Sequence, residues 1–215
     1  MAKRRKVGNL LALAVLGTLV QRPMHPYEMA SILRARGKDQ DMGFKWGSLY
    51  TVVGNLGKHG LIEAVETGRQ GARPERTVYR ITGAGRAELV DWVRELVSTP
   101  EPERRRFQAG LSLLGALGPD ETAGLLRARL DELERQLATQ REALTRHREE
   151  LPRLFLIEDE YDLALRQAEA DWVRSFLDEL TAESFPGLAQ WREFHDTGRL
   201  PPGLAEIAER GAIDD

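Results

Sequence analysis

Basic and hydroxyl-bearing side chains gather around one short stretch of the chain, Gly47 to His59. A helix beginning at Gly47 or Ser48 would turn Leu49, Val52 or Val53, and Leu56 inward. The polar residues left on or beside its outward face are Lys45, Ser48, Tyr50, Thr51, Asn55 and Lys58. Lysine suits phosphate oxygens, and serine, threonine and asparagine can hydrogen-bond phosphates or base edges. The pattern therefore predicts a DNA-binding helix, with Gly60 ending it in a left-handed turn.

Two short strands follow this helix and are separated by a long basic tip. "LIEAVET" and "RTVYRIT" alternate as strands do. A hairpin that only had to close could use a two-residue turn. The tip and its edge instead carry Arg69, Gln70, Arg73 and Arg76. Because arginine fits a narrow minor groove, the tip is predicted to bind DNA as well.

The charge balance divides the chain in the same way. Through Glu95 there are 16 lysines and arginines against 9 acidic residues, a balance of +7, and the remainder holds 15 against 25, a balance of −10. A basic first half and an acidic second half favour a polyanion partner for one end, although chance variation between two domains would give the same asymmetry.

The elements around the predicted helix complete a small domain. Residues 10–20 are apolar almost all round, as in a buried helix, and a second helix is expected from Pro26 to Gly37. After the strands, Thr82 can cap a helix over about 84–97 with Leu89, Val93 and Leu96 inward. This predicts a mainly α protein with an N-terminal winged helix-turn-helix, three helices plus a two-stranded wing, at residues 1–97.

Residues 98–215 are predicted to form a helical dimerisation domain. After the "STPEPE" linker, a helix over about 103–117 is expected, then a long helix ended by Pro152 and another over about 158–180. Leucines recur at heptad spacing in the long helix, which is too long for a small monomeric core to cover. The two long helices are expected to form an antiparallel hairpin whose apolar seam meets a second subunit. On the second helix Tyr161, Leu165, Ala168, Trp172, Phe176 and Glu179 or Leu180 are expected to share a face. The dimer interface is predicted at Leu126, Leu130, Leu133, Leu137, Leu144, Trp172 and Phe176.

At these residues the chain resembles the PadR family of bacterial transcriptional regulators. The resemblance rests on "LAVLGTLVQRPMHPYEMASIL", "GSLYTVVGNLGKHGLIE" and "RPERTVYRITGAGRAEL". It departs from the family at Pro26, Gly54 and Gly57, and the two helical glycines should together cost about 2 kcal/mol of helix propensity. The resemblance implies a homodimeric repressor that binds a pseudo-palindromic operator and often responds to a small hydrophobic or phenolic effector.

Several residues keep two interpretations. Tyr27 and Tyr50 could donate their hydroxyls to phosphates or pack as core aromatics. Trp92, Trp172 and Phe176 could stack an aromatic effector or simply fill the core. The alternative function is a winged-helix protein–protein adaptor whose acidic helical half binds a partner protein.

Other functional classes find little support in the sequence. There is no cysteine, and the histidines at 25, 59, 147 and 195 are scattered, so we expect no metal or cofactor. No phosphate-binding glycine loop or nucleophile elbow occurs, so no enzyme activity is expected. The apolar run from Leu10 to Val20 has about half the length that spans a bilayer. We therefore expect a cytoplasmic protein without a membrane partner.

Overall fold

The fold comes from a computed structural model of the 215-residue chain, which describes residues 5, 7–38, 42–43, 45–68, 76–100 and 106–199. The chain divides into two compact units, Met1–Glu103 and Arg104–Asp215. Within the described residues, no helix is both long and apolar enough to cross a membrane.

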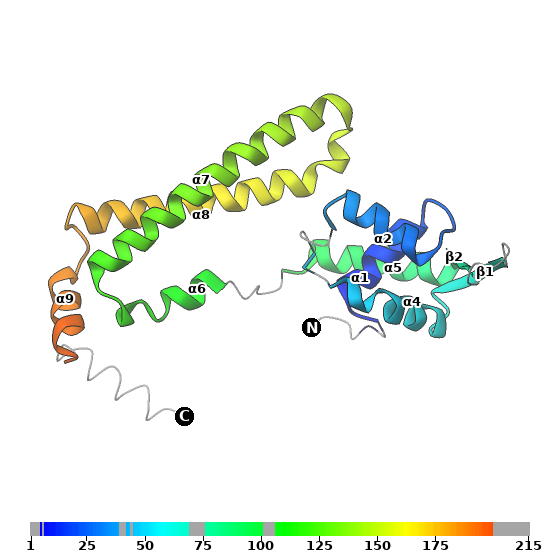
Figure 1. The fold of residues 1–215 in the computed structure, drawn as a ribbon, viewed down its shortest axis with the longest axis horizontal. Coiled ribbons are helices and arrows are strands. Elements are labelled where there is room, and N and C mark those ends of the chain that lie inside the picture. The colour runs from blue at the N-terminus through cyan, green and yellow to red at the C-terminus, as the bar shows by residue number, and fades with distance from the viewer. Residues whose placement is uncertain are drawn as a thin grey trace. The chain divides into compact units, whose positions relative to one another are not determined.

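The first unit is the predicted winged helix-turn-helix (Figure 1). Its elements in chain order are α1 (Leu10–Leu19), α2 (Pro26–Ala35), the short 3-10 helix η1 (Trp46–Ser48), α4 (Leu49–Lys58), β1 (Ile62–Gly68), β2 (Arg76–Ile81) and α5 (Gly83–Ser98). The residue types explain the two helix starts that precede η1. Asn9 accepts a hydrogen bond from the Leu11 amide at 2.6 Å, and His25 caps α2 with Pro26 in its first turn.

The core of this unit forms around α1, which is buried almost all round as predicted. Leu11, Val15 and Leu16 are fully buried and share one cluster with α2 and α4 side chains. From α4 the buried residues are those predicted: Leu49, Val52, Val53 and Leu56. Their burial fixes which side of α4 faces outward.

The wing is tied to the helices at two places. β1 and β2 pair antiparallel from Ile62↔Ile81 to Gly68↔Arg76, with a bulge between Ala64 and Glu66. Met24, just before α2, pairs with Tyr79 of β2 through two backbone hydrogen bonds of 3.0 and 3.1 Å. The strand pair is therefore held to the start of α2, and not only by the turn after α4.

Thr82 joins the end of the wing to α5. Its hydroxyl donates to the Gly60 carbonyl at 2.7 Å and accepts from the Gly85 amide at 3.0 Å. Gly60 itself has φ +68°, as the predicted left-handed turn requires. A Cβ on Gly85 would lie 2.0 Å from the Leu61 carbonyl oxygen, so α5 can approach the turn only with glycine there.

On α5 the inward face differs from the prediction. Trp92 is buried and Leu89 packs against the core, but Val93 and Leu96 are 45% and 47% exposed. Val90 and Val97 are exposed beside them. The helix has apolar residues on more than one side, and the core reaches only the side of Trp92.

The second unit is built on an antiparallel helical hairpin (Figure 1). Its elements are α6 (Arg106–Leu111), η2 (Leu114–Ala116), α7 (Pro119–Glu150), η3 (Arg153–Phe155), α8 (Ile157–Thr181) and α9 (Leu188–Thr197). The two long helices agree with the prediction. The helix expected over 103–117 is instead the short α6 followed by η2, and residues 101–105 lie outside the described residues.

The leucine seam of α7 is covered within one chain. Leu126, Leu130, Leu133 and Leu137 are 3–9% exposed and share a cluster with Ala170, Val173, Leu177 and Leu180 of α8. Leu144 is likewise buried, at 4%. The predicted antiparallel hairpin is therefore confirmed (Figure 1), but its leucine seam packs on α8 of the same chain, contrary to the expectation that this seam is left for a second subunit.

The face of α8 predicted to lie inward was also displaced. Of the predicted face Leu180 is buried, but Tyr161 and Trp172 are 64% and 48% exposed, and the other buried residues, Ala170, Val173 and Leu177, lie on a neighbouring stripe. Apolar residues occupy two adjoining stripes on α8, and the leucines of α7 cover one of them.

Candidate nucleic-acid interface

The outward face of α4 is the candidate interface, and its composition follows from the burial of the opposite side. Lys45, Tyr50, Thr51 and Lys58 are exposed, and Ser48 and Asn55 are partly exposed. The structure thus brings all six predicted residues of this region to one helix and its start. Lysines lie at both ends, with hydroxyl and amide groups between them.

Backbone groups add to the positive potential at the start of α4. The Ser48 hydroxyl donates to the Lys45 carbonyl at 2.8 Å and does not cap the helix. The Ser48 and Leu49 amides donate to the Lys45 and Trp46 carbonyls, so η1 leads directly into α4. The helix dipole therefore places partial positive charge near Lys45, where it favours an anion.

Acidic residues are absent from the sequence around this face. None occurs between Asp41 and Glu63. Within the described residues neither Lys45 nor Lys58 forms an ion pair, whereas Glu63 is engaged by Arg80 at 2.6 Å. The lysines of this face are thus available to an external polyanion.

The two tyrosines are surface residues. Tyr27 on α2 is 71% exposed and Tyr50 on α4 is 66% exposed. The core alternative for both is therefore wrong. Each presents a hydroxyl donor to solvent, which suits a phosphate contact.

The position of α2 relative to the start of α4 is fixed by contacts that the sequence did not suggest. The Arg34 guanidinium lies 4.5 Å from the Trp46 ring centroid. Arg22 forms an ion pair with Glu28, and this hydrogen bond lowers the pKa of the Glu28 carboxylate. The Arg34–Trp46 contact joins α2 to η1, which spacing in the sequence cannot indicate, whereas the Arg22–Glu28 pair is local to the start of α2.

The wing contributes less to the described surface. Arg69, Gln70 and Arg73 lie outside the described residues, and Arg76 begins β2. Their predicted DNA contacts remain predictions.

Arg5 is held against α5 within the first unit. Its guanidinium is nearly buried, pairs with Glu88 at 2.6 Å and with Glu95, and lies 5.1 Å from the Trp92 ring centroid. The acidic residues at positions 88, 91 and 95 share one side of α5, a spacing that could have indicated a cation site. Trp92, 5% exposed under Arg5, fills the core and offers no surface for an effector.

The remaining aromatic candidates belong to a row of rings in the second unit. Phe107, Trp172, Phe176, Phe185 and Trp191 follow one another with centroids 5.4–6.0 Å apart. The Trp191 indole donates to the Leu117 carbonyl at 2.8 Å. The row joins α6, α8 and α9, and Trp172 is its half-exposed member.

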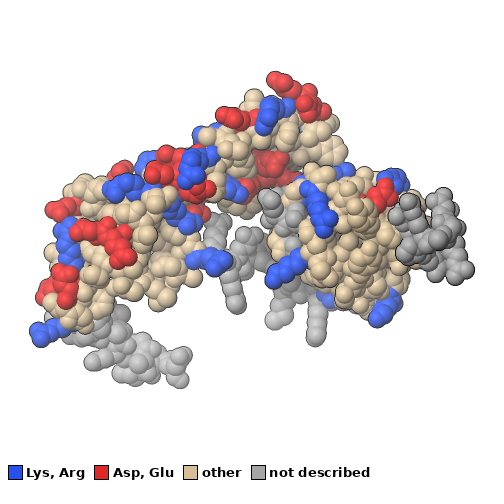
Figure 2. Space-filling model, viewed as in Figure 1, with Lys and Arg blue, Asp and Glu red and all other residues tan. Residues whose placement is uncertain are grey.

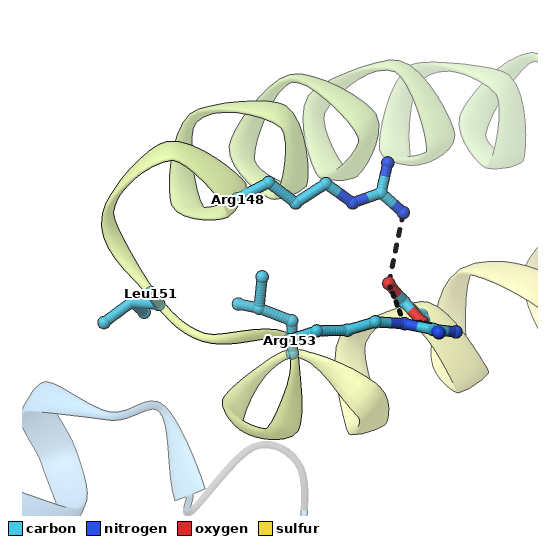
Figure 3. Close-up of a pocket in the computed structure, with 5 residues that line it drawn as sticks. Arg148, Leu151 and Arg153 are labelled. Carbon is cyan, nitrogen blue, oxygen red and sulfur yellow. Dashed lines mark hydrogen bonds and ion pairs between the residues drawn. The ribbon is translucent and has the colours of Figure 1, made fainter.

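A shallow cavity of about 310 Å³ lies at the tip of the hairpin and is lined by Arg148, Leu151, Arg153, Leu156 and Glu160. Figure 3 shows Arg148 reaching from α7 and Arg153 from the connecting segment toward one carboxylate. Arg153 and then Arg148 hydrogen-bond Glu160 and lower the pKa of its carboxylate. Within the described part of the chain, no cluster of three or more acidic or histidine side chains could hold a metal.

The two units carry their charges differently. On the face shown in Figure 2, acidic and basic side chains stand side by side over the hairpin, whereas the charged side chains seen on the first unit are mainly basic. The ion pairs agree: on the hairpin Arg174 pairs with Glu134 at 2.8 Å and Arg166 with Asp162 at 2.9 Å.

Comparisons with known proteins agree with this geometry. Residues 15–91 match the transcriptional regulator PadR-like family. The negative transcriptional regulator PadR of Bacillus subtilis is 24% identical over 134 residues, 60% of this chain and 70% of that protein. The probable transcriptional regulator Rv1176c of Mycobacterium tuberculosis is 30% identical over 95 residues, 42% of this chain and 47% of that protein.

Solved structures extend the likeness beyond the first unit. Bacillus subtilis PadR in complex with operator DNA has a TM-score of 0.67 at 21% identity, and the same protein in complex with p-coumaric acid has 0.68 at 19%. Each match covers 80% of this chain and 99% of the other. The virulence activator AphA of Vibrio cholerae has a TM-score of 0.57 at 23% identity, with the same coverage. At these identities the likeness shows the fold.

Proposed function

We propose, from the premise that residues 15–91 of this chain belong to the PadR-like family of transcriptional regulators, that the protein regulates transcription by binding duplex DNA through the outward face of α4. The observation that carries the proposal is the acid-free segment between Asp41 and Glu63, whose exposed lysines flank exposed hydroxyl groups on one helix face.

In this proposal α4 lies in the major groove. Lys45 and Lys58 bind phosphates, aided by the helix dipole at the start of η1 and α4, and set the position of the helix. Thr51 and Asn55 reach base edges, and Ser48, Tyr50 and Tyr27 bind phosphates or base edges nearby. Arg69, Gln70, Arg73 and Arg76 of the wing extend the contact to the adjacent minor groove.

The regulator acts as a homodimer on a pseudo-palindromic operator. Its two copies of α4 would occupy half-sites about one helical turn, or a multiple of it, apart. The Bacillus subtilis relative is a negative regulator and was solved with operator DNA, which supports repression by this chain. Of the predicted interface residues, Trp172 and Phe176 keep exposed surface for a second subunit, and the five leucines support the interface from within the hairpin.

A small aromatic effector relieves repression in this proposal. Bacillus subtilis PadR was solved with p-coumaric acid, and the row of rings around Trp172 and Phe176 would suit a flat ligand. The effector would act through a difference in its affinity for the DNA-bound and free arrangements of the dimer.

Titration of the full chain into a labelled duplex from upstream of its own gene, beside a scrambled duplex, tests the function. We expect tighter binding to the upstream duplex and a steep fall in affinity with salt. Absence of binding to either duplex at low salt would contradict the proposal and favour the protein–protein adaptor.

A further inference from the structure

Gly54 lies at the centre of the outward face of α4. It is exposed, and at helical spacing it neighbours Thr51 three residues before it and Lys58 four residues after it. The position that should carry the most direct contact with a groove therefore has no side chain.

The fold of this chain does not require glycine at position 54. Its φ is not in the left-handed region, unlike that of Gly60 at +68°, and a Cβ added to it would meet nothing within 4 Å among the described atoms. By contrast, the fold does require glycine at position 85, because an added Cβ there would lie 2.0 Å from the Leu61 carbonyl oxygen.

Glycine at this position has a measurable disadvantage. In a helix interior it is less favourable than alanine by about 0.5–1 kcal/mol. Glycine at position 54 therefore lowers helix stability, and no contact within the described structure explains why it is there.

We infer that Gly54 lets the backbone of α4 lie directly against the DNA, so that it sets the depth and register of the helix in the major groove. The inference rests on the proposed function. A glycine is the residue that permits close backbone approach, and an α-helix fits the major groove with little space to spare. A methyl group here would lift Thr51 and Asn55 away from the base edges.

Gly57 provides a matched control on the same helix. It also lacks a neighbour within 4 Å of an added Cβ, but it lies at the partly buried edge of α4, one residue after the buried Leu56. The same substitution therefore raises helix propensity at both glycines, more at the central Gly54 than at Gly57 in the last turn, and changes the groove-facing surface only at Gly54.

The test uses the full chain and its Gly54→Ala and Gly57→Ala variants. Wild-type protein first selects its preferred site from a library of random duplexes about 40 base pairs long, enough for two half-sites. Affinities for the selected duplex and a scrambled one are then measured over a series of salt concentrations, together with Tm.

We expect both variants to raise Tm by a few degrees. Gly54→Ala should lower affinity for the selected duplex about tenfold or more, as expected for overpacking a close interface, and Gly57→Ala by less than about twofold. Because no charge changes, the salt slope and the affinity for scrambled duplex should stay as in wild type.

Equal losses in the two variants would overturn the inference, because the glycines would then serve flexibility of the helix. Unchanged affinity in Gly54→Ala would overturn it as well. If wild-type protein enriches no sequence, the proposed function itself fails, and this outcome is distinct because it precedes any comparison of variants.

Discussion

The outward face of α4 and the outward surface of the α7–α8 hairpin are both rich in cations, but they use them in opposite ways. On the hairpin, Arg174 pairs with both Glu134 and Asp171, at 2.8 and 2.7 Å. Lys45, just before η1, and Lys58, at the end of α4, form no ion pair with the described residues.

The difference separates the ion-paired arginines of the hairpin from the lysines beside α4, which are available to a binding partner. Surface ion pairs contribute little stability, so the hairpin arginines serve chiefly to neutralise an acidic helix pair. Lys45 and Lys58 have no carboxylate partner among the described residues, so their positive potential is left for an external polyanion. The contrast locates the binding surface better than the net charge of −3, which sums over both regions.

The largest expected effect comes from a substitution that disrupts the packing of the α7–α8 hairpin. Leu133→Asp puts a charge at a site that is 8% exposed against α8 and should cost about 4 kcal/mol or more. We expect the second unit to unfold, measured as loss of helical circular dichroism and of hydrogen-exchange protection over residues 119–181. Leu125→Asp, at a site 55% exposed, is the control and should leave the fold intact. If Leu133→Asp were instead folded and monomeric, Leu133 would have to lie at a subunit interface.

The next largest effect is expected from a substitution that destabilises the first unit. Gly85→Ala forces a methyl group against the Leu61 carbonyl and should destabilise this unit by about 2–4 kcal/mol. Hydrogen exchange should rise over residues 10–97 and not over the hairpin. Gly83→Ala, where a Cβ meets nothing within 4 Å, should have little effect. Equal effects of the two substitutions would contradict the close packing at Gly85.

Substitution of single cations tests directly whether the first unit or the hairpin binds DNA. Lys58→Ala should lower the salt slope of DNA binding by about one and weaken affinity about fivefold at physiological salt. Arg73→Ala, in the wing, should lower the slope by a similar amount. Arg174→Ala removes the same charge from the hairpin and should leave the slope unchanged. A lowered slope for Arg174→Ala would show that the hairpin also binds DNA.

The smallest effect concerns an ion-paired carboxylate at the hairpin tip. Hydrogen bonds from Arg153 and then Arg148 lower the pKa of Glu160 below its ordinary value of 4.5. A carboxyl group whose pKa is lower in the folded state stabilises the fold above its unfolded pKa, and this contribution disappears as pH falls through the lowered value. The Tm of wild type should therefore exceed that of Glu160→Gln at neutral pH, and the gap should close in acid. A gap independent of pH would contradict the role of the charge.

The first unit was largely predictable because particular residue types in its sequence require particular backbone conformations. Thr82 and Gly60 were predicted as a cap and a left-handed turn, and both are observed. The buried side of α4 was predicted because its apolar residues form one stripe. The exposure of Tyr27 and Tyr50 was not predictable, since tyrosine suits both core and surface.

In the second unit, the antiparallel pairing of the two long helices was predictable from the sequence, but the faces that meet were not. Periodicity gave α7 and α8, but α8 carries two apolar stripes, and spacing alone does not say which one meets α7. The stripe of Val173 and Leu177 meets the leucines, while Trp172 joins the row of rings. The Arg5 and Arg34 contacts join distant segments, so no local pattern could reveal them.

Hydroxyl-radical footprinting of the full chain, with and without the selected duplex, tests the central claim most directly. Tyr50 on α4 and Tyr161 on α8 are 66% and 64% exposed, so they should oxidise at similar rates in free protein. If α4 binds the duplex, DNA will protect Tyr50 and leave Tyr161 unchanged. Protection of Tyr161 with no protection of Tyr50 would contradict the account and move the DNA-binding surface to the hairpin.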